Sequence, residues 1–424
     1  MLKKLLPYIF VFIFLNWYSG LHAQDRFPRP EFESDYVYPE HQAPFQRSYL
    51  LDYLDVAVLI AALSVTAWLA VKKRSRRGLV GMSVFSLLYF GFFRKGCICP
   101  VGSVQNVSLA LFNSDYSIPL TALLFFIVPL VFALLYGRVF CAGVCPLGAI
   151  QELTGFSPVK LPKAAETVLA SVPFIYLAVA VLFAAMKSHF LICRYDPFVG
   201  IFRLDAPHTI LIFGALLLLA GIFVNRPYCR YLCPYGAILN IFSRFSGKHL
   251  SITPAECINC RLCENACPYD AILKPDAVPT AEERKKIRKM FLTWIILIPV
   301  FTAAGALVFH NLGPVMAGIT REVRLAGEIR LEKESGIEAV SKDAVAFKEA
   351  GKTEDELFTE ELAIIHRFRK ASPWAGGFLG LSLGISLVAL TIRTGRTGYE
   401  PHRGKCYSCG RCFKYCPVQV SKKD

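Results

Sequence analysis

The fold of this chain is decided by residues 257–268, CINCRLCENACP, together with residues 406–417, CYSCGRCFKYCP. Both stretches space their cysteines as C-x-x-C-x-x-C-x-x-x-C-P, which is the spacing that bacterial ferredoxins use to hold [4Fe–4S] clusters. A zinc site needs only four ligands, usually as two separated pairs, so two complete runs that end in Cys-Pro argue against zinc. The two stretches therefore predict iron–sulfur chemistry and electron transfer.

Two such runs in one ferredoxin domain share ligands, because the fourth cysteine of each run binds the cluster of the other run. We therefore expect two [4Fe–4S] clusters. The predicted ligands of cluster 1 are Cys257, Cys260, Cys263 and Cys416, and those of cluster 2 are Cys406, Cys409, Cys412 and Cys267. A pair of clusters joined in this way is predicted to act as an electron relay.

The rest of the composition is typical of a membrane protein. Hydrophobic residues make up 54% of the chain, and the mean hydropathy is +0.44. Residues 1–23 place two lysines before an apolar run, as a signal peptide or an N-terminal anchor does. Seven further apolar runs are predicted to cross the membrane. They cover residues 49–71, 78–93, 120–137, 167–186, 209–224, 290–309 and 374–392.

The net charge of +15 is explained by membrane topology without a nucleic-acid partner. Lys and Arg cluster within residues 72–77, 226–289 and 393–423. These three clusters fall on the same side of the membrane if each of the seven apolar runs crosses it. Basic loops stay in the cytoplasm, so that side is predicted to be cytoplasmic. We expect a multi-pass protein of the bacterial inner (cytoplasmic) membrane with its ferredoxin clusters on the cytoplasmic side.

The predicted fold class is mainly α, with a polytopic helical membrane core and a cytoplasmic two-cluster ferredoxin-like domain assembled from two separated segments. Within the outer loop, residues 337–370 have the composition of one or two amphipathic helices. The predicted order is a signal peptide or anchor (1–23), an extracytoplasmic segment (24–48), a transmembrane core with Cys-Pro repeats (49–249), the first ferredoxin half (250–289), a transmembrane segment (290–309), an extracytoplasmic loop (310–371), a transmembrane segment (374–392) and the second ferredoxin half (393–424).

An internal repeat lies in the membrane core. Its copies are CPVGSVQN at 99–106, CPLGAIQE at 145–152 and CPYGAILN at 233–240, and a degenerate copy, DPFVGIF, lies at 196–202. Proline after cysteine favours a helix that starts immediately afterwards, so each cysteine is predicted to lie at a helix N-terminus. That position stabilises a thiolate, which is the form that binds metal.

The topology divides the repeat cysteines between the two sides of the membrane. A further iron–sulfur or metal centre is one interpretation of them, soft thiolates being suited to such centres. Helix-packing motifs with reduced or redox-active thiols are the other. The inner candidate set is Cys141, Cys145, Cys229 and Cys233, and the weaker outer candidate set is Cys97, Cys99, Cys193 and Asp196.

In these motifs the chain resembles the NosR/NapH-type membrane polyferredoxins, which are 4Fe-4S ferredoxin-type membrane proteins related to CcoG (FixG/RdxA). The resemblance covers about residues 75–424 and rests on the Cys-x-x-x-Cys-Pro runs together with the ferredoxin runs. It implies electron transfer between a quinol or cytoplasmic donor, such as a ferredoxin or flavoprotein, and an extracytoplasmic flavin protein or respiratory reductase system.

Two departures from the family pattern shape this expectation. Residues 24–48 leave no room for the N-terminal flavin domain of NosR, so any flavin is expected in a partner protein. The sequence after Cys416 is also shorter than the soluble domain in which CcoG-like proteins end. No catalytic residues are predicted. Whether the protein is an enzyme stays open, and quinol oxidation is the reaction considered. The alternative functions are redox maturation or copper handling for a respiratory enzyme, as in CcoG-like proteins, and a redox sensor.

Overall fold

The computed structural model describes residues 48–96, 99–155, 159–204, 206–252, 257–276, 280–336, 341–349, 353–391, 396 and 398–418. The chain divides into two units, Met1–Ser48 and Tyr49–Asp424, and the described helices and strands lie in the second. The expected signal peptide or anchor and Cys97 lie outside the described residues.

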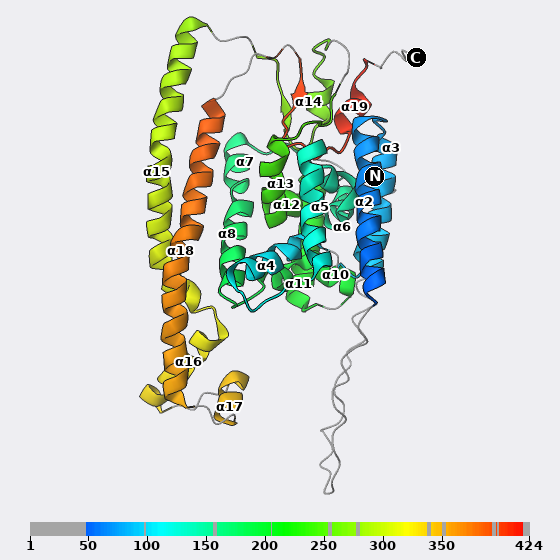
Figure 1. The fold of residues 1–424 in the computed structure, drawn as a ribbon. Coiled ribbons are helices and arrows are strands. Elements are labelled where there is room, and N and C mark those ends of the chain that lie inside the picture. Colours follow the sequence, from blue (N-terminus) through cyan, green and yellow to red (C-terminus); the bar gives the residue numbers. More distant parts are fainter. Residues whose placement is uncertain are drawn as a thin grey trace. The chain divides into compact units, whose positions relative to one another are not determined.

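Apolar helices build the core of this unit (Figure 1). Two of them consist of consecutive segments. α3 continues into a π-helical turn, η2, and the short helix α7 directly precedes α8. The core helices are α2 (Tyr49–Val71), α3 (Arg76–Ser86) with η2 (Leu87–Phe93), α5 (Leu120–Tyr136), α7 (Lys163–Leu169), α8 (Val172–Ala185) and α11 (His208–Phe223).

A short helix follows each copy of the Cys-Pro repeat, as the sequence predicts. The proline is the first residue of the helix, and the residue before it is the N-cap with extended backbone. Proline suits this position because its fixed φ is helical and it has no N–H to leave unpaired. These helices are α4 (Pro100–Phe112), α6 (Pro146–Thr154), α10 (Pro197–Arg203) and α13 (Pro234–Arg244), and the short elements before the last three are η3 (Phe140–Val144), α9 (Leu191–Tyr195) and α12 (Pro227–Tyr231).

The two ferredoxin stretches meet in space, although two long helices separate them in sequence (Figure 1). The first contains α14 (Leu262–Ala266) and β1 (Ile272–Leu273), and the second contains β2 (Glu400–Pro401) and α19 (Arg411–Tyr415). β1 and β2 pair antiparallel, and α14 lies against α19.

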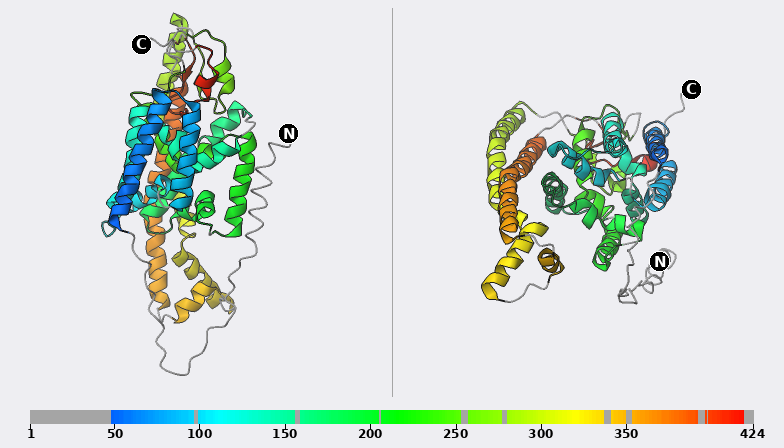
Figure 2. Two further views of the ribbon diagram at one scale, coloured as in Figure 1. Left: turned by 90° about the vertical axis from the view of Figure 1, so that its right-hand side faces the viewer. Right: turned by 60° about the horizontal axis from the view of Figure 1, so that its bottom comes forward.

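The intervening chain forms a helical pair, α15 (Ala281–Ala317) and α18 (Glu354–Thr391), which lie side by side (Figure 1 and Figure 2). Both helices are longer than the apolar runs at 290–309 and 374–392. Much of the expected outer loop is therefore helix that continues these two segments. Between them lie α16 (Arg321–Ser335) and α17 (Lys342–Glu349).

Fewer helices qualify as complete spans than the seven apolar runs. By length and hydropathy, four do so within the described residues, or five if α10 and α11, which are bent by 109°, count as one. α5 has 17 residues, and α3 with η2 does not qualify. The count of seven stays a prediction, while the multi-pass helical character is clear. The four are Leu50–Val71, Ala165–Ala185, Ala281–Ala317 and Glu354–Ala389.

The turn between β2 and Cys406 is organised by His402. Its backbone N–H donates to the carbonyl oxygen of Ala271 (2.7 Å), and its Nδ1 accepts from the N–H groups of Gly404 (3.1 Å) and Lys405 (3.3 Å). Burial, followed by the charges of Lys405 and Arg244, lowers the pKa of His402 from 6.5 to about 4. The neutral imidazole is therefore the form that the folded ferredoxin domain holds.

His402 makes the stability of this domain sensitive to acid. The unfolded chain takes up a proton on His402 below about pH 6.5 and the folded chain does not, so stability falls as the pH drops from 6.5 to 4, by at most about 3 kcal/mol. His402→Asn keeps an acceptor for the two N–H groups without titrating. In the intact protein in detergent, unfolding followed by denaturant titration should show a smaller loss of stability over this pH range in the variant. An identical pH dependence in both proteins would contradict the role of His402.

The helical pair is predicted to be sensitive to side-chain size at Gly380. A Cβ atom there would overlap the carbonyl oxygen of Phe301 on the facing helix. Gly380→Leu should therefore separate α15 from α18 and lower the free energy of unfolding by about 1–3 kcal/mol, as overpacking does. Unfolding of the purified protein in mixed micelles measures this change. Gly327→Leu in α16 is the matched control, since a Cβ at Gly327 meets no atom within 4 Å. An equal loss in both variants would refute close packing at Gly380.

Candidate iron–sulfur sites

The first candidate site is a small cavity in the ferredoxin part. The residues predicted for cluster 1 all line it: three from the first stretch and Cys416 from the second. Cys260 is exposed, and the neighbouring Ile258 has 63% of its surface exposed. This site therefore lies next to solvent.

The second candidate site is a small cavity lined by the residues predicted for cluster 2. Three come from the second stretch and Cys267 comes from the first. Burial, followed by the charge of Cys409, raises the pKa of Cys406 to about 12. Buried thiolates need a cationic partner to offset their desolvation, and iron supplies one, so these residues suit a cluster.

The local backbone explains where the fourth cysteine of each stretch lies. Cys267 is the C-cap of α14 and Cys416 is the C-cap of α19, and both leave their helix with extended backbone. The pairing of β1 with β2 brings the two stretches together, so each terminal cysteine reaches the cavity formed mainly by the other stretch.

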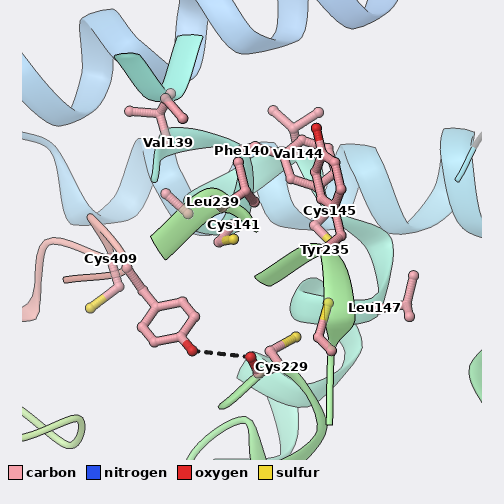
Figure 3. Close-up of a cluster of buried hydrophobic side chains, with 14 of the residues drawn as sticks. Val139, Phe140, Cys141, Val144, Cys145, Leu147, Cys229, Tyr235, Leu239 and Cys409 are labelled. Carbon is pink, nitrogen blue, oxygen red and sulfur yellow. Dashed lines mark hydrogen bonds between the residues drawn. The ribbon is translucent and has the colours of Figure 1, made fainter. Parts of the chain in front are cut away.

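The inner candidate set lies in the same apolar core as the cysteines of the second ferredoxin cavity. All four cysteines are buried. Figure 3 shows Cys141, Cys145 and Cys229 in one small region, with Cys409 to one side. Cys145 and Cys233 are the N-caps of α6 and α13, positions that favour negative charge.

Polar hydrogens point at the inner sulfur atoms. Gln151 Nε2 donates to Sγ of Cys229 (3.3 Å), and the Gly236 N–H donates to Sγ of Cys233 (3.3 Å). Such donors stabilise thiolates and tune clusters bound to them.

The structure also gathers Cys99, Cys193 and Asp196 of the outer set. Sγ of Cys193 lies 3.2 Å from where a Cβ atom of Gly102 would be, just after Cys99. Asp196 is 3% exposed and caps α10. Cys97, the fourth member, lies outside the described residues.

Nowhere in the described part of the chain are three or more His, Cys, Asp or Glu side chains placed to hold a single metal ion. This holds for the ferredoxin cysteines as well as for the membrane cysteines. A cubane cluster places four irons between its thiolates and therefore holds them farther apart than one ion does.

Sequence reasoning missed Glu152, a buried carboxylate that joins the ferredoxin part to the membrane core. It pairs with Arg226 (2.9 Å), Arg411 (2.7 Å) and Arg76, and it accepts a hydrogen bond from the Tyr269 hydroxyl (3.2 Å). Burial would raise the pKa of Glu152, but the three guanidinium groups lower it well below its usual range. The only sequence signal was an acidic residue at the end of one Cys-Pro repeat, and its partners are distant in sequence.

Sequence reasoning also missed Tyr407, which links the second ferredoxin cavity to the inner cysteines. Its hydroxyl donates to the carbonyl oxygen of Cys229 (3.1 Å), the hydrogen bond dashed in Figure 3. The ring is fully enclosed, with the Arg138 guanidinium 4.1 Å from its centroid and the Tyr269 ring at 4.6 Å. Tyr407 is bonded directly to Cys406, so a short covalent and hydrogen-bonded path runs from Cys406 to Cys229.

Comparison with known families agrees with this distribution of cysteines. A family model described as a 4Fe-4S binding domain matches residues 118–164 and 206–253, which contain the inner set. A second 4Fe-4S binding domain model matches residues 250–273, which contain the first ferredoxin stretch. No solved structure matches the chain.

Several curated proteins are similar to part of the chain. MJ0750 of Methanocaldococcus jannaschii is 33% identical over 43% of this chain and 77% of its own length. The regulatory protein NosR of Stutzerimonas stutzeri is 30% identical over 54% of this chain, and the chain spans 34% of NosR. YccM of Escherichia coli is 29% identical, and the chain spans about half (52%) of it. The ferredoxin-type protein MauN of Paracoccus denitrificans is 28% identical over 35% of this chain. The chain therefore belongs to the NosR/NapH-type family of ferredoxin-like 4Fe-4S membrane proteins, with an electron-transfer or other redox role.

Proposed function

We propose that this protein transfers electrons through [4Fe–4S] clusters between a cytoplasmic or quinol donor and an extracytoplasmic respiratory reductase system. The observation that carries the proposal is the Tyr407 link between the second ferredoxin cavity and the inner cysteines. A ferredoxin domain that served only soluble partners would not need a short path into the membrane core. When bound, [4Fe–4S] clusters supply one-electron redox chemistry.

The two ferredoxin sites take different places in the proposed relay. Cluster 1, held by Cys257, Cys260, Cys263 and Cys416, is the site next to solvent and therefore exchanges electrons with the donor. Cluster 2, held by Cys406, Cys409, Cys412 and Cys267, lies between cluster 1 and the membrane. The cytoplasmic position of both is part of the proposal and is supported by the basic loops on that side.

The inner set is proposed to hold a third cluster. The burial of all four cysteines, the donors to Cys229 and Cys233, and the 4Fe-4S binding domain match over residues 118–164 and 206–253 support it. Arg138 contacts both the Tyr407 bridge and the inner cysteines. Its guanidinium lies over the Tyr407 ring and 3.9 Å from Sγ of Cys141. Its positive charge stabilises electrons at this point of the relay.

Iron content and ligand pairing test the proposed clusters. In anaerobically purified full-length protein, the two ferredoxin clusters should contribute about 8 irons per chain. The inner cluster should raise this count to about 12. Cys260→Ala and Cys416→Ala should remove the same [4Fe–4S] EPR signal, and Cys409→Ala and Cys267→Ala should remove the other. Lys414→Ala on the exposed face of α19 is the control and should keep both. An iron-free protein would refute the function, and loss of different signals within a pair would refute the exchange of fourth cysteines.

The role of Tyr407 is tested by rate. Tyr407→Phe keeps the ring and removes the hydroxyl that reaches Cys229. Freeze-quench EPR after mixing with a low-potential reductant should show normal reduction of the ferredoxin clusters and slower reduction of the inner cluster. Iron content should not change. Tyr415→Phe, at an exposed tyrosine of α19, is the matched control. Equal rates in wild type and Tyr407→Phe would show that electrons do not follow this path.

A further inference from the structure

The outer cysteines lie in a repeat of the inner site. Residues 193–197 are CRYDP and residues 229–234 are CRYLCP, so Asp196 stands where Cys233 does. Both residues cap the helix that follows. Oδ1 of Asp196 accepts from the N–H groups of Phe198 (2.9 Å) and Val199 (3.2 Å), as Sγ of Cys233 accepts from Gly236.

A glutamine occupies the same repeat position at both sites. Gln151 accepts the Tyr228 N–H through Oε1 (3.0 Å) and donates to Sγ of Cys229 through Nε2. Gln105 accepts the N–H groups of Ile192 (3.0 Å) and Cys193 (3.3 Å) through Oε1.

Gln105 differs in one respect. Its side chain is fully buried, and its Nε2 has no hydrogen-bond partner. A buried donor without a partner is destabilising, so it needs an acceptor in the working protein. By the repeat, that acceptor is the thiolate of Cys193 or a sulfide bound beside it.

Two thiols lie near each other at this position, close enough for their charges to interact. A Cβ atom at Gly102, three residues after Cys99, would lie only 3.2 Å from Sγ of Cys193, so a larger residue there would press on that sulfur atom. The Asp196 carboxylate lies near both thiols, which gives the set two sulfur donors and one oxygen donor.

Tyr228 connects this set to the inner one. Its hydroxyl donates to Oδ2 of Asp196 (3.0 Å), and its own backbone precedes Cys229. The Tyr407 hydroxyl reaches the carbonyl of that same Cys229. Two tyrosines therefore join the second ferredoxin cavity, the inner cysteines and the outer set in one covalent and hydrogen-bonded path.

We propose that Cys99, Cys193 and Asp196 hold an iron–sulfur cluster, which is the point where electrons leave the protein. The proposal rests on the relay above for its electron source. In the step, the inner centre loses one electron and the outer centre gains it, and no bond or proton moves. The outer centre then reduces an extracytoplasmic one-electron acceptor.

The iron content of variants tests the outer site independently of the two ferredoxin sites and the inner site. The full-length protein, purified without oxygen and reconstituted with ferrous iron and sulfide, should lose about 2–4 irons in Cys193→Ser while both ferredoxin EPR signals persist. Tyr195→Phe, at the exposed neighbour of Asp196, should keep the wild-type content. Unchanged iron and an unchanged spectrum in Cys193→Ser would overturn the outer cluster alone, whereas missing ferredoxin signals in wild type would overturn the relay.

Two further measurements cover a variant that fails to fold. Asp196→Cys restores the inner ligand pattern and should keep the iron while changing the spectrum of one centre only. In wild type, Cys99 and Cys193 should resist maleimide until iron is chelated. Immediate labelling of both thiols, or a disulfide between them, would overturn the proposal.

Discussion

The buried carboxylate of Glu152 is the interaction on which the rest of this structure depends. An isolated charge in an apolar core is unstable, and this one is tolerated because three guanidinium groups and a tyrosine hydroxyl surround it. Its partners come from α3, the start of α12 and both ferredoxin stretches. Removing Glu152 would leave three guanidinium groups without their shared counter-charge, so this carboxylate holds the ferredoxin part against the membrane helices.

That fixed position gives the proposed relay its geometry. The Tyr269 ring packs at a tilt against Tyr407, and its hydroxyl donates to Glu152, so the contact that positions the ferredoxin domain also positions the bridge to Cys229. Arg138 then covers the other side of the bridge. The docking contacts and the proposed electron path therefore share the same residues.

The Cys-Pro repeat is the second organising element. Each copy makes a helix begin at a capping residue, whichever side of the protein it lies on. A single local rule thus places cysteines at helix N-termini at several points in the core, and it places Asp196 at an equivalent point.

The sequence by itself determined the ferredoxin spacing, the helix starts after each Cys-Pro pair and the helical membrane core, because these depend on residues close together in the chain. It also grouped Cys267 and Cys416 with the opposite stretches, since the motif implies that exchange. Only the tertiary structure decided which charges and rings meet. Glu152 contacts Arg226 and Arg411, and Tyr407 contacts Cys229, across separations for which the sequence has no periodic pattern. Such contacts are set by how helices pack, and a packed interior can bring any two positions together.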